Sequence, residues 1–310
     1  MISFRHHVAS LVAVFAALAV GVVLGGGPLS ELGRDDDEPA PQQVSDSSAH
    51  AAYGDEFAEA SASTLYGERL SGQQVAVLSL AGADTEITDG VVTQLEAAGA
   101  QIAGRYEGRT NLTSPDQQGM VDSLATQLTE DLDLGDAVPS DLSSHERIGR
   151  LLGRAVVSTQ PEGEAADTTS GTILDVMETG ELVTAPTERV GRVPFLVVVM
   201  GEERDDATAT ALLTGLVSGL GTAALGEVVV GSTDSGDDGD LARLRAEDLG
   251  DVATVDGGET LVGQVSAVLG LAAVRDGVAG AWGAFGNDGA VPVVAASTSG
   301  GTGDDAADDE

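Results

Sequence analysis

Short, continuous apolar runs alternate with stretches of helical spacing along most of the chain. Runs such as 75–80 and 195–200 are apolar at nearly every position, which is typical of strands buried on both faces of a parallel sheet. The same pattern predicts further strands at 101–106, 228–230 and 252–255. Apolar positions three and four apart predict helices at 53–70, 87–98, 120–128, 148–155, 173–177, 212–220 and 261–272. This alternation predicts an α/β fold, a layered Rossmann-like domain with a mostly parallel sheet.

The α/β domain is predicted to cover residues 71–296. An acidic, Thr-rich stretch in its middle leaves open that it consists of two halves, 71–135 and 190–296. Residues 31–70 predict an acidic tether followed by a short helical stalk. The polar, acidic tail at 297–310 predicts disorder.

Residues 1–30 predict a transmembrane anchor. An uncharged run from residue 8 to 28 follows Arg5, and no Asp, Glu or Arg occurs between Arg5 and Glu31. About 20 apolar residues suffice to cross the roughly 30 Å hydrocarbon core of a bilayer. Because the base precedes the run and acids follow it, we expect a single pass through the plasma membrane, with a cytoplasmic N-terminus and an extracytoplasmic C-terminal domain. A signal peptide cleaved near 25–27 is the alternative.

Small residues recur at every fourth position of this run and would line one face of a helix. They are Ala9, Ala13, Ala17, Gly21 and Gly25. Such faces let two transmembrane helices approach closely, which a cleaved signal peptide does not require. We therefore expect the anchor to pack against a membrane partner, either a second copy that forms a homo-oligomer or another single-span envelope protein.

The charge balance is strongly acidic. The chain has 51 Asp and Glu residues against 14 basic ones, all of them Arg, for a net charge of −37. Adaptation to a saline exterior and drift in a GC-rich genome both explain this composition. Without a basic stripe to meet phosphates, the chain is not expected to bind nucleic acid. The absence of Cys excludes disulfides, thiolate metal sites and Cys nucleophiles.

The stretch from Met1-Ile-Ser-Phe-Arg to Gly27-Pro-Leu resembles the start of the actinobacterial copper transport protein B (MctB) family. The resemblance continues at Phe57-Ala-Glu-Ala, along 72–82 and at Gly280-Ala-Trp-Gly. It implies a cell-envelope protein with a role in copper efflux or homeostasis. Two departures stand out: His6 occupies a position that is usually Tyr in the family, and the heptad-rich stalk after the span is much shorter here.

Residues that ligate copper are not grouped in the sequence. Cu(I) prefers thiolates and thioethers, with imidazole as an alternative. The candidate donors are Met1, Met120, Met177, Met200, His6, His7, His50 and His145. The methionines are far apart, and two of them lie inside apolar patterns typical of a core. The adjacent histidines flank Arg5 on the cytoplasmic side. We predict no metal site and no cofactor, so copper is implied by the resemblance alone.

The resemblance also implies an outer-membrane channel, but the strand pattern does not favour one. A transmembrane barrel needs at least eight strands of about ten alternating residues and two aromatic girdles. Aromatic residues make up only 3% of this chain, and its strands are short and continuously apolar. We therefore expect a domain that is not a β-barrel and that conducts nothing alone.

Other binding and catalytic motifs are missing from the sequence. The acidic stretch 234–240 lacks the residue order of an EF-hand and is interpreted as a solvated loop, with weak divalent binding as the alternative. No phosphate-binding Gly-rich motif and no recognisable Ser/His/Asp set occurs. We predict a protein that is not an enzyme, without catalytic or cofactor-binding residues.

The segment Gly280-Ala-Trp-Gly-Ala-Phe-Gly286 concentrates the only Trp and a Phe among glycines. Packing of a C-terminal turn onto the core is the favoured interpretation. A partner-binding loop is the alternative, and its candidate residues are Gly280, Trp282, Gly283, Phe285 and Gly286.

Two functional hypotheses remain after the sequence analysis. The resemblance favours a non-enzymatic, membrane-anchored envelope protein of copper transport. The residues themselves supply packing surfaces rather than ligands, which favours a scaffold that holds partners for envelope assembly or cell separation. Both hold if the effect on copper is indirect.

Overall fold

The computed structural model describes residues 41–67, 69–188, 191–204 and 206–293. The chain divides into two units, Met1–Tyr53 and Gly54–Glu310. The predicted anchor at 1–30, with its stripe of small residues, and the predicted tail at 297–310 lie outside the described residues. No helix within the described ranges is long and apolar enough to cross a membrane.

The described strands form one open, seven-stranded sheet in the order β3-β2-β1-β4-β5-β6-β7. Only the edge strand β3 is antiparallel to its neighbour; the other pairs are parallel. The strands are β1 (Gln74–Ser79), β2 (Gln101–Gly108), β3 (Val183–Thr184), β4 (Phe195–Val199), β5 (Gly226–Val230), β6 (Val252–Val255) and β7 (Ala281–Trp282). The predicted α/β fold with a mostly parallel sheet is confirmed. Because β1 pairs with β4, the strands of both predicted halves belong to one sheet.

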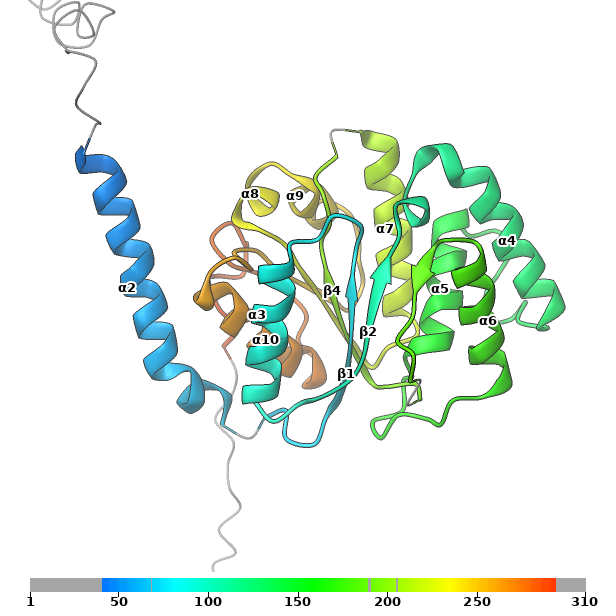
Figure 1. The fold of residues 1–310 in the computed structure, drawn as a ribbon, viewed down its shortest axis with the longest axis horizontal. Helices are drawn as coiled ribbons and strands as arrows, with labels where there is room; N and C mark the ends of the chain where they lie inside the picture. Colours follow the sequence, from blue (N-terminus) through cyan, green and yellow to red (C-terminus); the bar gives the residue numbers. More distant parts are fainter. Residues whose placement is uncertain (1–40, 68, 189–190, 205, 294–310) are drawn as a thin grey trace, which may run out of the picture. The chain divides into compact units, whose positions relative to one another are not determined.

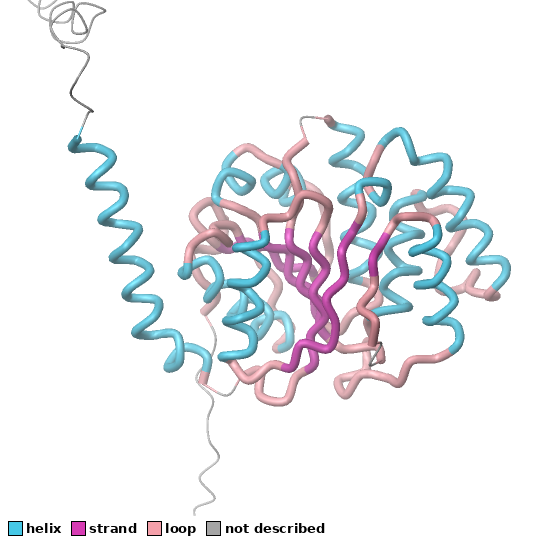
Figure 2. Tube along the Cα trace, viewed as in Figure 1, coloured by secondary structure: helices cyan, strands magenta, loops and turns pink. Residues whose placement is uncertain are grey.

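Helices cover both faces of this sheet (Figures 1 and 2). One face packs against α3, α10 and the C-terminal part of α2, and the other against α4, α5, α6, α7 and α9. The helices are α2 (Pro41–Tyr66), α3 (Thr85–Ala97), α4 (Gln118–Asp131), α5 (Ser144–Val156), α6 (Thr168–Thr179), α7 (Ala207–Gly221), α8 (Thr233–Asp237), α9 (Asp240–Arg245) and α10 (Leu261–Arg275). Every residue of β4, β5 and β6 is buried, which explains why their sequences are apolar apart from Glu227 and Thr254.

The structure differs from the sequence prediction at the start of one helix and at several short elements. Helix α2 begins at Pro41, within the predicted tether, and proline is well tolerated in the first turn of a helix. The edge strands β3 and β7 contain two residues each, too few to leave a periodic pattern. The acidic stretch 234–240 is not a solvated loop: it contributes to α8 and α9, with Ser232 capping α8.

Glycines bring α5 and α7 unusually close together. A Cβ atom added at Gly149 would lie 2.4 Å from the carbonyl oxygen of Leu216, and one at Gly219 would lie 2.3 Å from that of Glu146. Each helix carries a Gly-xxx-Gly pair at this contact, Gly149 with Gly153 and Gly215 with Gly219. The sequence pattern that we assigned to the anchor is therefore also used inside the folded domain.

A carboxyl group is buried in the sheet. Glu227 of β5 is only 1% exposed, and within the described part of the chain both of its side-chain oxygens lack hydrogen bonds. It lies beneath the C-terminal end of α7, where a Cβ atom at Gly221 would be 3.3 Å from its Oε2. Burial raises the pKa of Glu227 well above its usual value, because a charge in this apolar position has no compensating group.

We predict that Glu227 makes the stability of the fold depend on pH. The raised pKa means that the folded state keeps a proton that the unfolded state loses, so stability falls as pH rises above the ordinary glutamate pKa. Glu227→Gln removes this titrating group and with it this contribution to the dependence of stability on pH. Relative to the variant, the wild type should lose up to about 1.4 kcal/mol of unfolding free energy per pH unit within that window. Urea unfolding followed by circular dichroism between pH 5 and pH 8, as approximate limits, measures the difference. If the unfolding free energies of the wild type and the variant change in parallel with pH, the buried carboxyl group of Glu227 is compensated in the folded state and the prediction is wrong.

Candidate functional site

The strand order places a topological switch point between β1 and β4. Open α/β sheets commonly bind ligands there, outside the carboxyl ends of the strands. In this protein the loops after the two strands are in contact. A Cβ atom at Gly82 would lie 2.7 Å from the Cβ of Glu202, and one at Gly201 would lie 2.2 Å from the carbonyl oxygen of Ala81. The usual ligand crevice is therefore closed.

A network centred on Arg204 reinforces this closure. The Nη1 of Arg204 donates to the carbonyl oxygen of Thr113 at 3.0 Å, and its backbone N–H donates to Asp240 at 3.1 Å. Arg243 donates to both the carboxylate of Asp240 and the carbonyl oxygen of Arg204, each at 3.0 Å. Burial raises the pKa of Asp240, and the nearby carboxylate of Glu203 adds to this effect. The cavity that remains beside Arg204 measures about 10 Å³.

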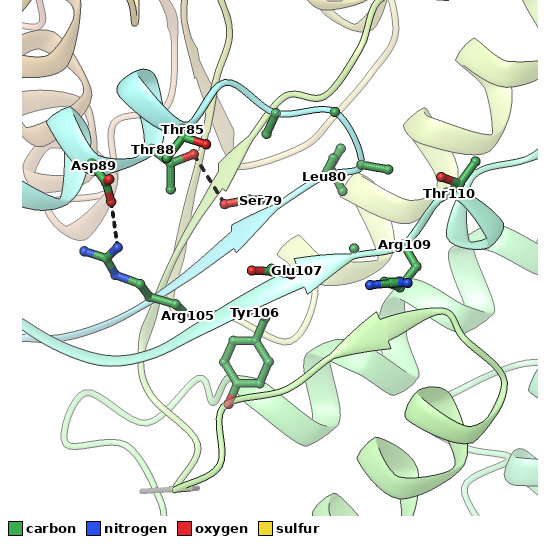
Figure 3. Close-up of a pocket in the computed structure, with 14 residues that line it drawn as sticks. Ser79, Leu80, Thr85, Thr88, Asp89, Arg105, Tyr106, Glu107, Arg109 and Thr110 are labelled. Atoms are coloured by element: carbon green, nitrogen blue, oxygen red, sulfur yellow. Dashed lines mark hydrogen bonds and ion pairs between the residues drawn. The ribbon is translucent and has the colours of Figure 1, made fainter.

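A larger pocket opens at the carboxyl ends of β1 and β2, on the side of the sheet that α3 covers (Figure 3). Its volume is about 420 Å³, within the usual range for small-molecule sites. Hydroxyl groups and charges dominate its wall. The polar residues that line it include Ser79, Thr85, Thr88, Asp89, Arg105, Glu107, Arg109 and Thr110.

A β-bulge in β2 directs charged residues toward this pocket. Val75 pairs with Ile102, but Ala76 pairs with Gly104, so Ala103 is an extra residue in β2. Side chains alternate between the two faces of a strand, and an extra residue reverses the alternation beyond it. Arg105 and Glu107 consequently point to the face that carries α3 instead of the opposite face.

The charged groups of the pocket differ in how they are paired. Arg105 forms an ion pair with Asp89 of α3 at 2.7 Å, and both side chains are about half exposed. Ser79 and Thr88 approach each other through their hydroxyl groups at 3.4 Å, which is long for such a bond. Among the described residues, the side chains of Glu107 and Arg109 have no hydrogen bond or ion pair. The pocket therefore offers one free carboxylate and one free guanidinium group.

These pocket residues were not predicted as a site from the sequence. Their signal is the alternation of charges at Arg105, Glu107 and Arg109, at the end of a predicted strand. Alternation of this kind indicates a strand with one open face.

The glycine-rich segment at 280–286 is packed against the domain. Trp282 lies in β7, is 4% exposed, and contacts the α10 helix at Gly270. Gly283 has a φ of +121°, and a Cβ atom there would be 2.5 Å from the carboxyl group of Asp256. Gly280 and Gly286 likewise leave no room for a side chain beside Trp282. Phe285 remains 44% exposed.

A buried ion pair holds this segment in place. The carboxylate of Asp256, which is fully buried, accepts hydrogen bonds from the backbone N–H groups of Ala284 and Phe285 and from Arg245 at 2.8 Å. Arg245 also donates to the backbone carbonyl of Trp282 at 2.8 Å. The pair thus fixes the turn that presents Phe285.

The copper-ligand candidates do not come together. Met177 and Met200 lie in the core, and Met120 packs against it. His145 is fully buried at the start of α5, where burial lowers its pKa, and its Nδ1 lies 3.3 Å from the Oγ of Ser144. No group of three His, Asp or Glu side chains within the described ranges is arranged to hold a metal ion. Met1, His6 and His7 lie outside those ranges.

These features define an α/β protein with an open, mostly parallel sheet, a closed switch point and a polar pocket beside it. The model of the family described as "Copper transport outer membrane protein, MctB" matches residues 1–293. Since the match covers nearly the whole chain, this protein belongs to the MctB family, and the resemblance found in the sequence is confirmed. No curated protein matches the chain.

We predict that Asp256→Asn strongly destabilises the domain. The change would leave Arg245, whose side chain is 7% exposed, buried without a counter-charge. Loss of one partner from a buried pair costs about 3–5 kcal/mol. Asp89→Asn is the matched control, because it breaks the exposed pair with Arg105 and should cost at most about 1 kcal/mol. Urea unfolding of both variants measures the difference, and equal losses would contradict a special role for Asp256.

Proposed function

We propose that this protein is a non-enzymatic component of the cell envelope that contributes to copper efflux or homeostasis. Residues 1–30 anchor it in the plasma membrane by a single span, with the N-terminus in the cytoplasm and the α/β domain outside. Membership of a family described as copper transport proteins supports the role in copper handling. The order of charges around the apolar run supports the orientation.

The domain contributes to copper handling without ligating the ion. The observation that carries this proposal is the position of Met177 and Met200, whose side chains are 0% and 6% exposed inside the apolar core. Thioether groups in such positions act as packing groups, and reaching them would require the core to open. Copper is therefore cargo of a larger assembly in which this chain holds or positions a partner.

Scaffolding of envelope assembly or cell separation is the second candidate function. It is favoured by Phe285, which is partly exposed on a turn fixed by Asp256 and Arg245. Phe57 on α2 is also 63% exposed. Exposed aromatic side chains on rigid elements are common anchors of protein–protein contacts. The partner in the membrane would pack on the small-residue face of the anchor.

We predict that a chain with both Met177→Leu and Met200→Leu restores copper tolerance to a deletion strain as well as the wild type does. Exchange of Met for Leu in a core costs less than about 1.5 kcal/mol per site, so the domain stays folded. Growth across a copper series measures tolerance, and microscopy of septa in the same strains measures cell separation. Cu(I) titration of the purified full-length chain gives an independent readout.

Loss of tolerance in a folded double variant, or tight stoichiometric binding of Cu(I) by the wild type that the double variant loses, would contradict the proposal that the domain does not ligate copper. A deletion strain with normal copper tolerance and defective septa would favour scaffolding instead.

A further inference from the structure

The pocket at the ends of β1 and β2 has a donor and acceptor arrangement that the copper role does not use. Its free carboxylate is Glu107, and its free guanidinium is Arg109. In the view of Figure 3 the carboxylate of Glu107 lies between the guanidinium groups of Arg105 and Arg109. Arg105 is already neutralised by Asp89, so Arg109 is the cation of the pocket that remains available.

We propose that this pocket binds a sugar that carries an acidic group, through contacts from Glu107 to neighbouring hydroxyl groups and from Arg109 to the acid. The ligand is a single sugar unit with a phosphate or a carboxylate, either free or at the end of a glycan chain.

The position of Glu107 favours a sugar hydroxyl pair. A carboxylate only accepts hydrogen bonds, and its two oxygens match two neighbouring hydroxyl donors. In doubly wound α/β folds, an acidic residue downstream of the first strand–helix turn binds ribose hydroxyls in this way. Glu107 lies at the carboxyl end of β2, and the bulge at Ala103 directs it to the side of the sheet that α3 covers.

The hydroxyl groups of Ser79 and Thr88 are further hydrogen-bond partners for a sugar. Both line the pocket together with Glu107, and their mutual contact of 3.4 Å is weak. The hydroxyl of Thr88 donates to the backbone carbonyl of Asp84 at 3.0 Å, so it can accept a hydrogen bond from a sugar hydroxyl, whereas Ser79 can turn from Thr88 and either donate or accept. A ligand that replaces this contact between two neutral hydroxyl groups breaks no ion pair.

Arg109 determines where the acidic group lies. Its planar guanidinium carries five donors and suits a phosphate or a carboxylate. Glu107 repels an anion, so the acid must lie at the Arg109 end and the hydroxyl groups at the Glu107 end. The ligand therefore binds in one orientation.

The same geometry disfavours a dinucleotide. A pyrophosphate would need the N-terminus of α3, but the carboxylate of Asp84 caps that end by accepting from the N–H of Glu86 at 2.7 Å. Glu86 adds a second negative charge in the first turn. The second half of a dinucleotide would also need the crevice between β1 and β4, which the contact between Gly82 and Glu202 closes.

Calorimetric titration of the full-length chain in detergent micelles tests the site. The probes are glucose 1-phosphate and glucuronic acid, with glucose and inorganic phosphate as ligands that each supply only half of the recognised groups. We expect both acidic sugars to bind, and each half-ligand to bind at least about ten-fold more weakly. Competition by alginate oligosaccharides, which are chains of acidic sugars, would support the same site and identify a glycan end as the source of the ligand.

Three variants assign the contacts. Glu107→Gln should weaken glucose by about ten-fold or more, because a charged acceptor of its hydroxyl groups is lost and glucose carries no acid for Glu107 to repel. Arg109→Gln should reduce the acidic sugars to the affinity of glucose or below it, because Glu107 still repels the acid, and should leave glucose unchanged. Glu96→Gln, an exposed residue of α3 outside the pocket, is the matched control and should change nothing.

The proposal is overturned if neither acidic sugar binds at about 1 mM. It is also overturned if inorganic phosphate binds as tightly as glucose 1-phosphate, or if Glu107→Gln behaves like the control. The assay uses purified protein and no copper, so its outcome is independent of the proposed function.

Discussion

Burial of the sheet on both faces is the constraint on which the rest of the structure depends. Helices on each side exclude water from β4, β5 and β6, so these strands contain almost only apolar residues. The polar residues of the pocket lie at the carboxyl edge of the sheet and on the face of β2 that α3 covers. Glu227 of β5 is buried with no hydrogen bond to its carboxyl oxygens among the described residues, and this burial raises its pKa.

The carboxyl edge is closed at one place and open at another. Loop contacts at Gly82 and Gly201, together with the Arg204 network, fill the switch point between β1 and β4. The bulge at Ala103 turns Arg105 and Glu107 toward the α3 side, where a pocket of about 420 Å³ remains. A single extra residue in one strand thus decides which side chains reach the pocket.

Much of the fold could be predicted from sequence because its main elements are long and strongly periodic. The apolar runs at 75–80 and 195–200 gave strands in the expected places, and the spacing at 261–272 gave α10. The pocket could not be predicted, because the bulge is visible only in the pairing of β2 with β1. The closure depends on contacts such as Arg204 with Thr113, which are 91 residues apart and leave no local pattern.

Family membership indicates a role in copper transport, whereas the described domain offers buried thioethers and a sugar-sized polar pocket. The carboxyl edge of the sheet is closed after β4, where the loops touch, and open after β1, where the pocket lies. Because the chain has no Cys, single variants place one thiol at each position. Alkylation of the native full-length chain with iodoacetamide should modify Ser79→Cys readily and spare Met200→Cys until the protein unfolds. Equal modification of both thiols in the native state, or faster modification at position 200, would contradict the account.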